Sequence, residues 1–125
     1  MSAPNPTDIL LHRQSRILEI AFDDGARYEL PCEFLRVHSP SAEVRGHGPG
    51  QEVLQTGKQD VAITEIRAVG NYGICPVFSD GHDSGIFTWA YLHELGANRE
   101  RMWGDYLRKL EEAGFQRTAF ERDHE

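Results

Sequence analysis

The stretch ILEIAFDDGARYEL, residues 17–30, decides the fold. Apolar side chains alternate with other residues through 17–22, as they do in a strand with one buried face. Asp24-Gly25 follows, and Asp-Gly is a strong signal for a tight hairpin turn because glycine accepts a positive φ. Residues 27–30 then form the returning strand. The sequence therefore predicts an antiparallel β-hairpin.

A second pair of strands is expected further along the chain. Residues 61–69 (VAITEIRAV) alternate again, with Ile63 and Glu65 on one side, and residues 72–78 return the chain after a turn. Pro76 lies in the returning strand and has no N–H to donate, so that strand is expected to be an edge strand or to be bulged there.

Three helices are expected. Pro31 opens a short one through residues 32–38, and Thr88 is a suitable N-cap for another at 89–95. Asn98 is expected to cap the last helix.

This last helix carries an apolar stripe, on which Trp103 and Leu107 are the expected core anchors, and it ends at Gly114. Strands come first and helices last, so the expected fold class is α+β. Its small antiparallel β-sheet is built from hairpins and covered by the C-terminal helices.

Length and charge limit the function. The chain has 125 residues, a mass of 14.2 kDa and a formal net charge of −7. The length suits one domain, expected at 10–115 between a flexible N-terminus (1–9) and a flexible tail (116–125). The negative charge argues against nucleic acid or an anionic membrane as a partner. Two isolated cysteines, Cys32 and Cys75, form no disulfide framework, and with no export signal the protein is expected to be cytoplasmic.

Histidines and acidic residues gather at one turn, SDGHDSG (79–85). His82 lies there with Asp80 and Asp83, in a pattern that suits either a metal site or a hydrogen-bonded polar turn. His38, at the end of the first helix, and His47, in the glycine-rich stretch 39–60, are the other candidate ligands.

No complete catalytic set is present in the sequence. Ser79 or Ser84 with His82 and a neighbouring Asp could suggest a hydrolase, but these residues lie too close in sequence to converge from separate elements, and G-x-S-x-G is missing. There is no H-x-D or H-x-E step for a non-haem iron oxygenase, and HGPGQ lacks G-K-[ST]. The expectation is a protein that is not an enzyme.

Several segments of the sequence together resemble one family. These are the hairpin with DDG, EFLRVHSPSAEVRGHGPGQ, VFSDGHDSGIFTWAYLHELG and the final W-x-x-Y-L-x-x-L helix. They are similar to the gamma-butyrobetaine hydroxylase-like N-terminal domain family, which is catalogued as a domain of unknown function. The resemblance covers residues 10–115.

The resemblance also implies a structural zinc site, which this chain matches poorly. In the carnitine-pathway oxygenases, three cysteines and one histidine hold the zinc. The cysteine positions fall here on Ser39, Ser41 and Val44, and His82 falls on the histidine. A tetrahedral zinc needs four good donors, so zinc in that form is not expected. A weaker zinc or iron site would use His82 with His38 or His47.

Similar modules are fused to P-loop iron–sulfur cluster carrier proteins, which implies an accessory role. We therefore expect a non-enzymatic binding or adaptor module that docks to a partner protein, accessory to iron–sulfur or metal metabolism. The expected interaction surface includes Arg36, His47, Asp80 and Asp83. The alternative is a metal-binding protein with a site centred on His82.

Overall fold

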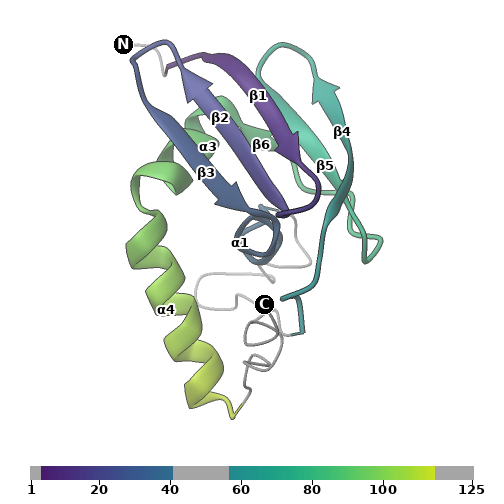
Figure 1. Cartoon of the computed structure of the whole chain (residues 1–125), viewed down its shortest axis with the longest axis vertical. Coiled ribbons are helices and arrows are strands. Elements are labelled where there is room, and N and C mark those ends of the chain that lie inside the picture. The colour runs from purple at the N-terminus through teal and green to yellow at the C-terminus, as the bar shows by residue number, and fades with distance from the viewer. Residues whose placement is uncertain (1–3, 41–56, 115–125) are drawn as a thin grey trace.

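The computed structural model of the chain describes residues 4–40 and 57–114. Two three-stranded antiparallel sheets, ordered β1-β2-β3 and β4-β5-β6, are followed by helices at the C-terminal end, which confirms the expected α+β class (Figure 1). The elements are β1 (Pro6–His12), β2 (Ile17–Phe22), β3 (Arg27–Pro31), α1 (Cys32–Val37), β4 (Ile63–Val69), β5 (Gly73–Phe78), β6 (Phe87–Thr88), α3 (Trp89–Ala97) and α4 (Arg99–Glu112).

The predicted hairpin at 17–30 is present as β2 and β3. Leu18 pairs with Leu30 and Ile20 with Tyr28, and Gly25 takes a φ of 91° in the turn. A residue with a Cβ is strained at this positive φ, and this is why the turn needs a glycine after Asp24.

The strand β1 differs from the prediction, in which residues 1–9 form a flexible N-terminus. Instead Pro6–His12 pairs with β2, and Ile9 and Leu11 lie opposite Ile20 and Leu18. Both side chains are partly buried against the core, whereas Leu10 between them is 52% exposed. The pairing partner supplies the order that this Pro-rich segment does not predict locally. The domain limits at residues 10 and 115 remain a prediction.

A register irregularity in β4 changes which of its side chains face the core. The shift lies between Ile63 and Glu65. Ile66 rather than Glu65 packs with Ile63 against the core, and Glu65 is exposed. A bulge of this kind adds one residue to a strand and so reverses the alternation beyond it.

Pro76 lies in β5, the middle strand of its sheet, and pairs with Ile66 of β4. On the other side, β6 pairs with β5 only at Gly73 and Ile74. At Pro76 the sheet is therefore locally an edge, which accommodates the missing N–H as expected.

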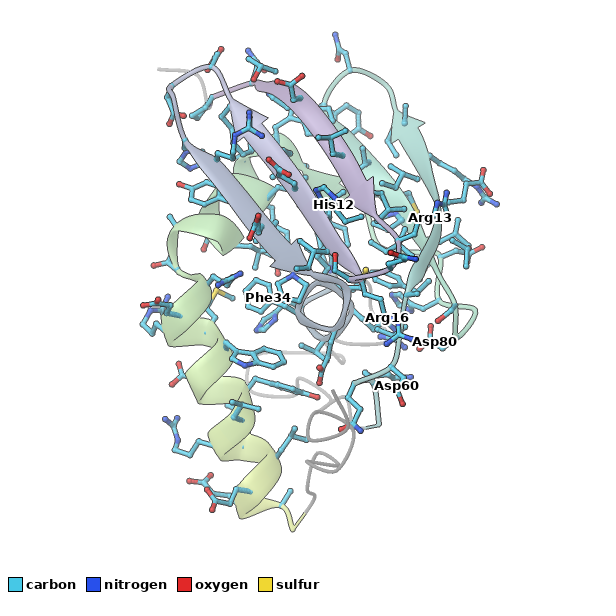
Figure 2. The ribbon with its side chains drawn as sticks, viewed as in Figure 1. His12, Arg13, Arg16, Phe34, Asp60 and Asp80 are labelled. Atoms are coloured by element: carbon cyan, nitrogen blue, oxygen red, sulfur yellow. The ribbon has the colours of Figure 1, made fainter. Side chains whose placement is uncertain are left out.

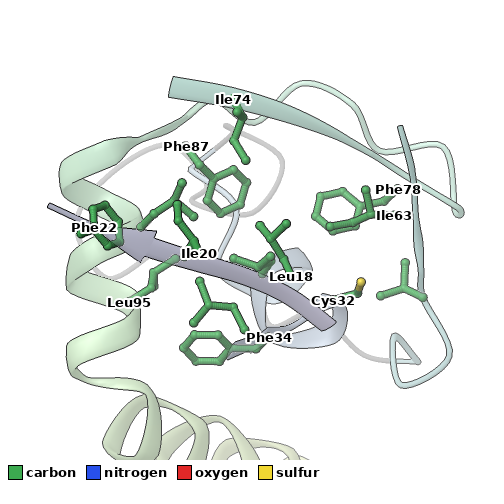
Figure 3. Packing of buried hydrophobic residues seen from close by; sticks show 14 residues of the cluster. Leu18, Ile20, Phe22, Cys32, Phe34, Ile63, Ile74, Phe78, Phe87 and Leu95 are labelled. Carbon is green, nitrogen blue, oxygen red and sulfur yellow. The ribbon is translucent and has the colours of Figure 1, made fainter. Parts of the chain in front are cut away.

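The core lies between the two sheets. Leu18 and Ile20 of β2 point toward Ile74, Phe78 and Phe87 of the second sheet, and Phe34 of α1 belongs to the same core (Figure 3). A smaller cluster joins α1 to α4 and consists of Val37, Tyr106 and Leu110.

The helices agree with the prediction except in the cap of α4 and in the residues that α4 buries. The Thr88 hydroxyl accepts a hydrogen bond from the Tyr91 N–H, so Thr88 is the expected N-cap. The Asn98 side chain, in contrast, donates to the Glu94 carbonyl at the end of α3 and makes no capping bond to α4. On α4, Trp103 and Leu107 are only partly buried, whereas Tyr106 and Leu110 are each 5% exposed.

Among residues 4–40 and 57–114, no helix is both long and apolar enough to cross a membrane.

Candidate functional site

A cluster of polar side chains lies where α1 meets the segment that follows β5. We call it the polar clasp, and it consists of Arg36, Ser39, Lys58, Asp80 and His82. Asp80 forms an ion pair with Arg36 of α1, and Figure 2 shows Asp80 to the right of this helix, close to Arg16 (Figure 2). Arg36 and Ser39 follow the first sheet in the chain, whereas Asp80 and His82 lie between β5 and β6 of the second sheet. The clasp therefore connects the two halves of the fold.

Asp80 is the acceptor at the centre of the clasp. Its Oδ2 accepts from Arg36 Nε at 2.9 Å and from Lys58 Nζ at 2.7 Å, and its Oδ1 accepts from the His82 N–H at 3.2 Å. Partial burial alone would raise the pKa of Asp80, but these hydrogen bonds outweigh it and hold the pKa at about 2. The carboxylate is therefore ionised at neutral pH and both oxygens are occupied.

Ser39 and His82 form the buried part of the clasp. His82 Nε2 and Ser39 Oγ lie 2.9 Å apart and share a hydrogen bond, and the two residues are 5% and 1% exposed. The turn after β5 brings His82 back over the strand: Gly81 has a φ of 93°, and the Phe78 N–H donates to the His82 carbonyl at 2.9 Å. The polar-turn interpretation of SDGHDSG describes this geometry.

Arg36 is enclosed, although the sequence placed it on an interaction surface. The residue is 6% exposed, and its Nη1 has no hydrogen-bond partner within residues 4–40 and 57–114. Asp80 is engaged with it. Asp83 does lie on the surface, with its side chain 52% exposed and 3.9 Å from Arg67 Nη1. His47 lies outside the described residues.

The candidate metal ligands do not converge in the part of the chain that the structure describes. There, no group of three or more His, Cys, Asp or Glu side chains could hold a metal ion. His38 packs against the rings of Phe34 and Tyr106, and its Nδ1 is bonded to the Phe34 carbonyl at 2.9 Å. Burial lowers the pKa of His38. Ser41 and Val44, two of the three positions that match the family's cysteines, lie outside the described residues.

The two serines considered for a hydrolase differ in their surroundings. Ser79 Oγ accepts from the Ala62 N–H at 2.9 Å, and Ser84 is an exposed residue of the same loop. The serine that His82 does contact is Ser39, whose 1% exposure leaves no path for a substrate carbonyl to its hydroxyl. A nucleophile must be able to reach its substrate, so this pair is structural.

A surface groove lies between the first residues of β3 and the junction of α3 with α4. Its volume is about 730 Å³. Gly96 of α3 packs on the Tyr28 ring so closely that a Cβ there would lie 2.3 Å from ring carbon atoms. The charged side chains that line it are Arg27, Glu29, Arg99, Glu100 and Arg101.

Sequence reasoning did not identify this groove. Its arginines come from residues 27 and 99–101, more than seventy positions apart in the chain. No local motif connects them, and only the packing of α3 on β3 brings them together. A basic pair at the start of the last helix was the one signal available.

Comparisons with known proteins agree with this fold. A family model described as gamma-butyrobetaine hydroxylase-like, N-terminal, matches residues 9–93. One NMR solution structure is 46% identical, covers 93% of this chain and 91% of its own, and has a TM-score of 0.81.

A crystal structure from Acidithiobacillus ferrooxidans, of a protein of unknown function in the DUF971 family, is 38% identical. It covers 77% of this chain and 99% of its own chain, with a TM-score of 0.64. No curated protein matches the sequence.

Proposed function

Because the chain belongs to the gamma-butyrobetaine hydroxylase-like N-terminal family, we propose that it is a non-enzymatic binding module that docks to a partner protein. The proposed setting is iron–sulfur or metal metabolism, since the resemblance implies modules of this kind joined to P-loop iron–sulfur carriers. The proposed docking surface is the groove between β3 and the α3–α4 junction. The partner is a protein segment rich in carboxylates.

The observation that carries this proposal is the charge of the groove. Three arginines and two glutamates line it, whereas the whole chain carries a net charge of −7. The charged residues of the groove therefore carry a formal net charge of +1, on a chain that is acidic as a whole. Complementary charges direct association and select partners, so an acidic segment fits this surface better than a basic one.

The arginines of the groove also retain N–H donors that a partner could use. Arg99 Nη1 donates to the Glu29 carbonyl, which fixes the guanidinium at the groove wall. Arg101 Nη1 lies 3.8 Å from Asp105, and Arg27 pairs with Glu19 outside the groove. A guanidinium has five N–H donors, so each side chain retains donors for a carboxylate of the partner. Arginine forks bind carboxylates in a bidentate geometry.

A capture experiment with matched variants tests the proposal. The wild-type chain, the double variant Arg99→Glu/Arg101→Glu and the control Arg108→Glu are immobilised and exposed to extract of the source cells. Arg108 lies on the same helix, is 58% exposed and does not line the groove. Mass spectrometry then compares the proteins retained.

We expect one partner to be retained by the wild type and by Arg108→Glu and lost from the double variant. Its binding should weaken as salt is raised, because exposed charges are screened. Retention that is the same on all three proteins, or no specific partner on the wild type, contradicts the proposal.

A further inference from the structure

The buried hydrogen bond between Ser39 and His82 lies at the position where the sequence suggests a metal site, and it has no part in the proposed docking surface. The two residues are 43 positions apart, and their side chains meet at 2.9 Å with almost no solvent exposure. Buried polar groups are costly unless they find partners. Each of these groups satisfies the other.

The geometry of this pair does not suit two ligands of one metal ion. Two donors on a tetrahedral zinc lie about 3.4 Å apart when each metal bond is about 2.1 Å long. The observed separation is 2.9 Å, which is an ordinary hydrogen-bond length. A metal between Ser39 and His82 would therefore require the two side chains to move apart.

The surroundings leave little room for such movement. A Cβ placed on Gly85 would lie only 2.0 Å from Ser39 Oγ and 3.4 Å from Pro40 Cδ. The backbone at Gly85 therefore packs directly on the Ser39 hydroxyl, which explains why this position needs a glycine.

The nearby carboxylates are also committed. Both oxygens of Asp80 accept hydrogen bonds from members of the clasp. Asp83 is directed to Arg67, with its side chain 52% exposed. Because a structural zinc site needs four good donors, the donors around His82 within the described residues do not fit one.

The hydrogen bond also connects two segments that belong to different sheets. Ser39 follows α1 and the first sheet, and His82 lies between two strands of the second sheet. The ion pair between Arg36 and Asp80, at 2.9 Å, runs beside it, three residues before Ser39 and two before His82. Two neighbouring polar contacts thus tie the same two segments together.

We propose that Ser39 and His82 form a metal-independent lock between the two sheets, in the place where the family resemblance implies a structural zinc. The lock is directional, because a hydrogen bond fixes both distance and angle. It sets the position of the 79–85 loop against the end of α1. This role does not depend on the groove or on its partner.

The test uses the full chain, purified without a histidine tag. Metal content is measured by elemental analysis, and thermal unfolding is followed with and without a strong chelator. The same unfolding curve is recorded for Ser39→Ala and for the control Ser84→Ala, which changes an exposed serine of the 79–85 loop.

We expect zinc and iron far below one ion per chain and an unfolding midpoint that the chelator does not change. Ser39→Ala leaves a buried imidazole without its hydroxyl partner, so its midpoint should fall by roughly 4–8 °C. Ser84→Ala should keep the wild-type midpoint.

Two outcomes would overturn the proposal. One is a stoichiometric metal whose removal by the chelator lowers the midpoint of the wild type. The other is a Ser39→Ala midpoint equal to that of Ser84→Ala. If Ser39→Ala does not fold, the metal content and the chelator response of the wild type still decide the question.

Discussion

The apolar core and the polar clasp both join the two sheets, but they do so by different physics. The core uses many side chains, among them Leu18, Phe34 and Phe87, each 0% exposed. Apolar burial is roughly proportional to area and has no preferred direction. The clasp uses few atoms, and its contacts depend on geometry, as between Asp80 and Arg36 at 2.9 Å. The core therefore supplies most of the stability, and the clasp specifies how the two halves align.

This difference also predicts how each region fails. A core side chain can be shortened and the loss is graded by the volume removed. Shortening a clasp residue instead removes a hydrogen-bond partner from a polar group that has little access to water, and that group is then left unsatisfied. Substitutions in the two regions should therefore differ in how much they lower the free energy of unfolding and in how this loss depends on pH.

The largest effect is expected at the core. Phe34→Ala removes a fully buried ring that contacts the rings of His38 and Trp103. The free energy of unfolding should fall by about 3–5 kcal/mol, as measured by urea denaturation. The control Leu10→Ala truncates a side chain that is 52% exposed and should change it by less than about 0.5 kcal/mol. Equal effects would mean that Phe34 is not packed in the core.

The next effect concerns the small apolar cluster between α1 and α4. Leu110 is 5% exposed, whereas Leu107 is only partly buried at the edge of the same cluster. Leu110→Ala should lower the free energy of unfolding by about 2–4 kcal/mol, and Leu107→Ala by clearly less. Urea denaturation of both variants ranks them. The reverse order would show that α4 presents a different face to α1.

The smallest of the three effects belongs to the clasp and depends on pH. Asp80 has a pKa of about 2 in the folded chain against an ordinary value of 3.8. A lowered carboxyl pKa stabilises the fold at pH values above the unfolded-state pKa. Because solvent screens this surface carboxylate, the contribution is about 1 kcal/mol, and it is lost as the pH falls from about 4 toward 2.

The variant Asp80→Asn isolates this contribution. At neutral pH it should be less stable than the wild type by about 1 kcal/mol, and this difference in the free energy of unfolding should narrow as the pH falls below about 4. Denaturation curves of both proteins across this range provide the measurement. Other carboxylates titrate equally in both, so they cancel in the difference. A gap that is independent of pH would contradict the proposed charge on Asp80.

The sequence predicted the local parts of the fold well. The 17–30 hairpin and the start of α3 at Thr88 depend on a turn signal and a cap that act over a few residues. It did not predict β1, because the ordering of Pro6–His12 comes from its pairing with β2. The exposed position of Glu65 follows from a register shift that no alternation pattern contains.

The candidate site was predicted only in part. The sequence drew attention to His82 and Asp80, and both belong to the clasp. It did not show that Ser39 and Arg36 would be their partners, because those contacts span 43 and 44 residues. The arginine-lined groove was missed for the same reason, since it exists only where α3 and β3 meet.

By itself, the amino-acid sequence determined the α+β class, the hairpin and the helix start at Thr88, because short-range backbone preferences and apolar periodicity set these features. Only the tertiary structure decided that SDGHDSG is a hydrogen-bonded turn, with His82 bonded to Ser39. The physical reason is that a histidine's chemistry depends on which groups face its ring nitrogens. Those groups come from distant parts of the chain, and folding alone brings them within hydrogen-bond distance.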